Sequence, residues 1–218
     1  MGTLNAVTAI TALRTRPDAA RWQAIRWASP LLGVGAGVST SFMQGWLAEP
    51  WSTLANSASP WLVVAFLVGC LQRGVPMAAV LGAFTCLGEV AGYYGASAAR
   101  DFGVSAGFVA VWVVCGVVGG PVFGACGRLA RGGGTRIAAA VGAVAPAATF
   151  LGEGIGSYWL RLGYHQDAVL YVAIGVLAGA PALALMRGRL LRLAITGLGI
   201  LAVIGCVVVY GFVLGAVG

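Results

Sequence analysis

The sequence lacks most of the side chains that soluble enzymes and metal proteins rely on. It contains no lysine, a single histidine (His165), and only 9% charged residues. Without lysine a retinal Schiff base is excluded, although a bundle of apolar helices would otherwise suggest one. A single histidine argues against a histidine-based metal centre, and none of the five cysteines stands in a Cys-x-x-Cys pair that would indicate zinc or a disulfide framework. We therefore expect no metal and no organic cofactor.

Hydrophobic residues make up 60% of the chain, which has 35 glycines and a mean hydropathy of +0.93. No soluble domain of 218 residues has this composition. We therefore predict an all-α polytopic membrane protein, with one transmembrane domain over residues 28–218 after an N-terminal segment, 1–27, that shows no cleavable signal peptide. The seven expected spans cover approximately residues 28–47, 60–72, 76–96, 104–127, 137–160, 168–186 and 193–215.

The net charge of +7 comes from arginine alone. If the N-terminus is cytoplasmic, only Arg100 and Arg161 of the 13 arginines fall in outer loops. Arginine and lysine concentrate in cytoplasmic segments of membrane proteins, so this arrangement predicts a protein of the cell membrane with its C-terminus outside. The arginines thus follow topology and do not indicate nucleic-acid binding. Segment 1–27 also carries tryptophans among its arginines, which is typical of an interfacial helix.

A repeated motif, Leu-Gly-Glu-x-x-Gly, occurs in two of the expected spans, at Leu87–Gly92 and Leu151–Gly156. In both copies aromatic residues, a short outer loop and a return helix with small residues before a proline follow the glutamate. A degenerate third copy has Gln44 as its nearest polar residue. Each copy starts on the same side, so the fold is predicted as parallel two-helix repeats plus a final helix. The repeats cover about residues 28–73, 78–131 and 137–192, and the final helix 193–215.

The two glutamates of the motif, Glu89 and Glu153, are the strongest candidates for a functional role. An ionised carboxylate in hydrocarbon costs on the order of 3 kcal/mol, so acids at two matching positions are unlikely to be incidental. Flanking glycines four residues apart let neighbouring helices approach closely. We expect both carboxyls to face one central cavity in the outer half of the membrane. Alternatively, each is a neutral structural acid that is hydrogen-bonded between helices.

Aromatic residues crowd the expected outer half of the membrane, where several would form an interfacial belt. Two of them, Tyr93 and Tyr158, lie about one helical turn from a glutamate and are predicted to line the cavity. Aromatic faces stabilise a desolvated cation by about 0.5–2 kcal/mol each. The predicted substrate-binding residues are Tyr93, Tyr158, Phe42, Trp46, Gln44 and Trp112.

An acid beside aromatic faces in an apolar cavity suits the protonation of an alkene or epoxide on an isoprenoid. Burial favours the protonated carboxyl, which can then donate its proton, while a second carboxyl could accept the final one. In size, helix number, paired acids and aromatic lining, the chain resembles the small bacterial membrane-bound terpene cyclases, whose members act on prenylated indoles. The resemblance implies class II type cyclisation of a hydrophobic prenylated substrate, with Glu89 and Glu153 as the catalytic acids. No Asp-Asp-x-x-Asp motif supports metal-dependent ionisation of a diphosphate.

Two other classes of function fit parts of the pattern. A proton-coupled transporter or channel would also use parallel repeats, intramembrane acids and glycine-rich helices. Against it, the sequence predicts no broken helix beside either glutamate, although Pro146 precedes Glu153. The third class is a membrane scaffold or immunity protein in which the acids only join helices. In each case the lipid bilayer is an expected partner.

Overall fold

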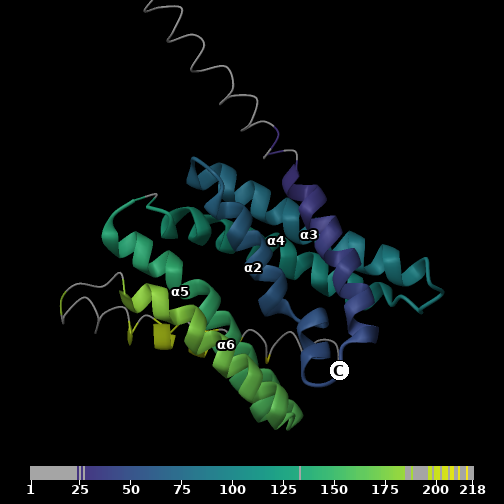
Figure 1. Ribbon diagram of the computed structural model, residues 1–218. Helices are drawn as coiled ribbons and strands as arrows, with labels where there is room; N and C mark the ends of the chain where they lie inside the picture. The colour runs from purple at the N-terminus through teal and green to yellow at the C-terminus, as the bar shows by residue number, and fades with distance from the viewer. Residues whose placement is uncertain are drawn as a thin grey trace, which may run out of the picture.

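The computed structural model describes residues 28–132 and 134–184, together with isolated positions at 24, 26, 188 and beyond 195. All regular structure in the described part of the chain is helical (Figure 1). The elements are a first helix over residues 28–46, the 3₁₀-helix η1 (Trp51–Asn56), α2 (Ala58–Cys70), α3 (Val75–Ala98), α4 (Ala106–Ala130), α5 (Arg136–Glu153), the π-helix η2 (Gly154–Leu162) and α6 (His165–Ala184).

The predicted all-α class is confirmed for these residues. Three helical segments are long and apolar enough to cross a membrane, namely Val75–Ala98, Ala106–Ala130 and Arg136–Leu162. Two further apolar helices, Ala58–Cys70 and His165–Ala180, are shorter. The predicted interfacial segment 1–27 and the predicted last helix 193–215 lie outside the described residues, apart from the isolated positions.

Glycines let α4 pack against both α2 and α3 at backbone distance. A Cβ added at Gly124 would lie 2.1 Å from the carbonyl oxygen of Ala78 in α3. A Cβ at Gly127 would lie 2.0 Å from the carbonyl oxygen of Phe66 in α2. Such separations are too short for any side chain, so glycine at these positions is required by the helix packing.

The first helix lies along α3 through contacts of the same kind (Figure 1). A Cβ at Gly37 would lie 2.0 Å from the carbonyl oxygen of Glu89, and one at Gly92 would lie 2.2 Å from that of Val34. The expectation that glycines beside Glu89 allow a close helix approach is therefore confirmed. The partner is the first helix.

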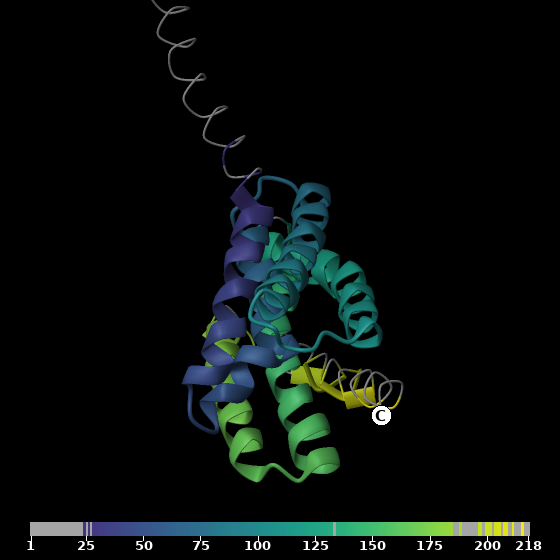
Figure 2. The ribbon, with the colours of Figure 1, turned by 90° about the vertical axis from the view of Figure 1, so that its right-hand side faces the viewer.

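Helix α5 begins with a side-chain cap, because Thr135 Oγ1 accepts a hydrogen bond from the Ala138 N–H at 3.2 Å. The α-helical pattern stops at Glu153, and the chain continues as the π-helix η2 until Gly163, whose φ of 69° ends it. The helix thus continues through Glu153 without a break, as predicted, but it changes from α to π geometry there, which the sequence did not predict. Helices α5 and α6 lie side by side and are joined by η2 and a short turn (Figure 2).

Candidate functional site

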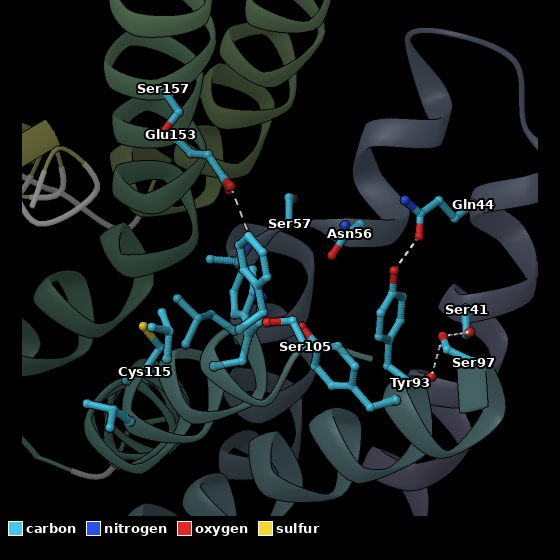
Figure 3. Close-up of a pocket in the computed structure, with 18 of the residues that line it drawn as sticks. Ser41, Gln44, Asn56, Ser57, Tyr93, Ser97, Ser105, Cys115, Glu153 and Ser157 are labelled. Carbon is cyan, nitrogen blue, oxygen red and sulfur yellow. Dashed lines mark hydrogen bonds between the residues drawn. The ribbon is translucent and has the colours of Figure 1, made fainter. Parts of the chain in front are cut away.

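A cavity of about 1350 Å³ lies between the first helix, the start of α2, the end of α3, α4 and the junction of α5 with η2. It exceeds the roughly 300–1,000 Å³ of most small-molecule pockets. Most of its lining is apolar, and polar side chains are grouped at the helix ends (Figure 3). The size and the lining together suit a large and mainly hydrophobic molecule.

Glu153 lines this cavity at the last α-helical position of α5 and is 5% exposed. Its carboxyl points toward the start of α2, beside Ser57 (Figure 3). One oxygen accepts the N–H of Ala58 at 3.2 Å, and the other accepts the N–H of Ser59 at 2.9 Å and the Ser59 hydroxyl at 2.5 Å. A carboxylate at a helix N-terminus is a favourable arrangement, because it satisfies unpaired N–H groups and the positive end of the helix dipole.

Glu89 does not line the cavity. It is fully buried in α3, and both of its carboxyl oxygens lack a hydrogen-bond partner among the described residues. The first helix covers this stretch of α3, since Gly37 contacts the Glu89 backbone directly. The expectation that both carboxyls face one cavity is therefore wrong for Glu89.

Four of the six predicted substrate-binding residues do line the cavity: Tyr93, Tyr158, Gln44 and Trp112. The Tyr93 hydroxyl donates a hydrogen bond to Gln44 Oε1, as Figure 3 shows. Trp61, which does not line the cavity itself, packs between Tyr93 and Trp112 with ring centroids 5.5 and 5.2 Å away. Tyr93 and Trp112 thus form an aromatic wall on one side of the cavity, with Trp61 packed against both.

The other two predicted residues, Phe42 and Trp46, lie outside the cavity lining. Their rings contact each other at 5.7 Å, and Trp46 is 79% exposed. Phe42 instead lies beneath the guanidinium of Arg100, which is 4.1 Å from the ring centroid. Trp46 therefore points away from the protein interior, and Phe42 supports the side chain of Arg100 instead of lining the cavity.

Two residues at or behind the cavity wall near Glu153 were not among the predicted site residues. Tyr171 of α6 is fully buried, stacks on Tyr158 at 4.7 Å and shares a 2.5 Å hydrogen bond with the Ser57 hydroxyl. Ser157 lines the cavity one turn after Glu153, and its buried hydroxyl has no partner among the described residues. The spacing of four between Glu153 and Ser157 placed them on one helix face, but only the fold brings Tyr171 and Ser57 to them.

No group of three or more His, Cys, Asp or Glu side chains suited to a metal ion occurs in the part of the chain that the structure describes. Over residues 16–216 the sequence matches the model of a family of unknown function, DUF6518. No curated protein and no solved structure matches the chain.

Proposed function

We propose that this chain, which belongs to the family of unknown function DUF6518, is a membrane-embedded isoprenoid cyclase. In this proposal the cavity binds a hydrophobic prenylated molecule and Glu153 protonates one of its alkene or epoxide groups. The cavity then guides ring closure of the resulting carbocation. The observation that carries the proposal is the carboxyl of Glu153, the one acid among the described residues that line a large cavity with aromatic walls.

The proposal includes seven membrane crossings, with the N-terminus in the cytoplasm and the C-terminus outside. Three long apolar helices support membrane insertion. Large apolar side chains exposed on different helices, such as Leu32, Val122 and Leu177, would face lipid. The concentration of arginine in the alternate loops supports the orientation. The parallel arrangement of the helix pairs is part of the same proposal.

The surroundings of Glu153 suit an acid that gives up a proton and later recovers it. Two N–H groups and the Ser59 hydroxyl already point at the carboxyl oxygens and stabilise the negative charge left after transfer. The proton forms a new C–H bond on the alkene, and the cation closes the ring. A neighbouring C–H then loses its proton to the Glu153 carboxylate. Because one proton is donated and one is recovered, the substrate is isomerised and no second acid is required.

The aromatic wall supplies what the cationic intermediate needs. The rings of Trp112, Tyr93 and Tyr158 border the cavity and present π-electrons, which attract a cation without reacting as a water molecule would. Excluding water is essential because water would capture the carbocation before ring closure. Glu89 has no part in these steps, since its fully buried side chain does not line the cavity.

The test uses purified protein in detergent with a farnesylated aromatic acceptor and no added Mg²⁺, and detects cyclised product by mass spectrometry. Glu153→Gln keeps the side-chain volume but removes the transferable proton, and we expect activity to fall about 10²–10⁴-fold. Glu89→Gln is the matched control from the same motif and should retain activity within a few-fold. Full activity in a folded Glu153→Gln variant would refute the mechanism.

One observation favours a second candidate, a proton-coupled transporter. The helix changes from α to π directly after Glu153, and irregular helices beside an intramembrane acid are common at ion and substrate sites. In this case proteoliposomes would show proton flux that is lost in Glu153→Gln, and no isoprenoid would be turned over.

A further inference from the structure

One arginine of the described part of the chain borders the same cavity. Arg100 follows the end of α3, is half-buried, and lines the cavity together with the polar side chains of Ser41, Ser97 and Ser105. It forms no ion pair with any carboxylate in the described residues. A guanidinium keeps its positive charge at every physiological pH, so this edge of the cavity carries an uncompensated cation.

The protein fixes the position of this guanidinium from several sides. Its Nε donates to the carbonyl oxygen of Ala96 at 3.1 Å, and its Nη2 donates to the carbonyl oxygen and hydroxyl of Ser41 at 2.8 and 2.5 Å. The rings of Phe42 and Phe102 lie 4.1 and 5.0 Å from it. These hydrogen bonds leave the second terminal nitrogen, Nη1, without an assigned partner. Two N–H donors on a held guanidinium suit an anionic oxygen group.

The position of Arg100 relative to the acid matters for the shape of a ligand. Ser41, which accepts the Arg100 hydrogen bonds, and Ser97 lie at one end of the side chains drawn in Figure 3, and Glu153 lies at the other. The lining between them is mainly aromatic and aliphatic, and Asn56, Ser57 and Ser105 are the polar residues labelled there. The arrangement is polar and cationic at one end, mainly apolar along its length, and acidic at the far end.

We propose that the ligand of this cavity is an anionic amphiphile, whose phosphate or carboxylate head binds Arg100 while its apolar chain extends toward Glu153. The inference rests on the proposed function and narrows its substrate class. The head group is either that of an isoprenoid phosphate or carboxylate, or that of an anionic membrane lipid. The chemistry that Arg100 recognises is the same for both.

The test measures binding to protein in neutral nanodiscs, and so does not depend on turnover. Three probes share one chain and differ in charge: farnesyl monophosphate, farnesol and farnesyl-trimethylammonium. Wild type should bind the phosphate at least about tenfold more tightly than the other two. Arg100→Gln should lose about 10- to 100-fold in affinity for the phosphate and leave farnesol binding unchanged, because charge-assisted hydrogen bonds are removed.

Arg161 provides the matched control, since it is the other arginine of the predicted outer loops, is exposed and does not line the cavity. Arg161→Gln should keep the preference for the phosphate. Glu153→Gln should also keep it, so the two proposals fail separately. Absence of cyclisation with a retained phosphate preference would count against the cyclase alone, and equal binding of the three probes would count against the anion site alone. If Arg100→Gln does not fold, the comparison of the three probes on wild type decides alone.

Native mass spectrometry of wild type from vesicles of phosphatidylglycerol and phosphatidylcholine separates the two sources of the head group. Selective retention of phosphatidylglycerol, lost in Arg100→Gln, would identify a lipid head group. Preference for farnesyl monophosphate without lipid retention would identify an isoprenoid anion. Equal binding of all three farnesyl probes, with no selective lipid retention, would overturn the proposal.

Discussion

Replacement of Gly37 by alanine tests the close contact between the first helix and α3 at Glu89. Gly37 lies in the first helix against α3, and an added Cβ would be 2.0 Å from the carbonyl oxygen of Glu89 and 2.8 Å from the amide nitrogen of Tyr93. A carbon and a carbonyl oxygen normally stay about 3.3–3.6 Å apart. The two helices would therefore have to separate by more than about 1 Å.

The expected loss of stability follows from this displacement. Both atoms in the way belong to the backbone, so no side chain can rotate to make room. Overpacking of this kind typically costs about 1–3 kcal/mol. Gly35 offers a matched control two residues earlier in the same helix, because nothing lies within 4 Å of its added Cβ. Alanine there should be neutral or stabilise by up to about 1 kcal/mol, the gain in helix propensity.

Thermal unfolding of both variants in the same detergent, followed by circular dichroism, gives the comparison. We expect Gly37→Ala to unfold several degrees below wild type and Gly35→Ala at or above it, since 1 kcal/mol corresponds to about 2–4 °C for a chain of this size. When unfolding is irreversible, the order of the unfolding temperatures of the two variants and wild type matters more than their absolute values. Equal stability of the two variants would refute the close contact between the first helix and α3.

Three further predictions follow from the same description. Fusion of a reporter active only in the cytoplasm to Gly218 should give no signal, because the proposed C-terminus is outside; a strong signal would mean that the number of crossings is wrong by one. Glu89→Leu should raise the unfolding temperature, since it removes a buried carboxyl that has no hydrogen-bond partner among the described residues. Glu153→Leu should lower the unfolding temperature, because it leaves two N–H groups at the start of α2 unpaired. Shifts of the same sign would contradict the different surroundings of the two glutamates. Tyr93→Phe should keep most cyclase activity because the π-face remains, while Tyr93→Leu should lower it or change the products, as chromatography of the products would show.

The positions of the helices could be predicted from the sequence because apolar length is a local property of the chain. The expected spans 76–96 and 104–127 correspond to α3 (Val75–Ala98) and α4 (Ala106–Ala130). The glycines of α3 also indicated a close helix approach correctly. Short elements were harder to predict from the sequence, since the formation of η1 and η2 depends on the residues that surround them rather than on apolar length.

The surroundings of the two glutamates could not be predicted in the same way. Both lie in the motif Leu-Gly-Glu-x-x-Gly, and nothing within the motif distinguishes them. What differs is the neighbouring helix. The Glu153 carboxyl accepts hydrogen bonds from the N–H groups of Ala58 and Ser59, whereas the backbone of Glu89 packs against Gly37. These contacts join residues far apart in sequence, so no local pattern reveals them.

Both neighbours come from one stretch of chain, residues 28–73, which the sequence predicts as the degenerate copy of the repeat. Its first helix has glycine where it contacts the Glu89 backbone. Its second helix, α2, instead begins beside Glu153, whose carboxyl lies at the edge of the cavity. The two identical motifs thus have different environments. Among the described residues that line the cavity, Glu153 is the one acid, so the proposed chemistry uses Glu153 both to donate and to recover the proton.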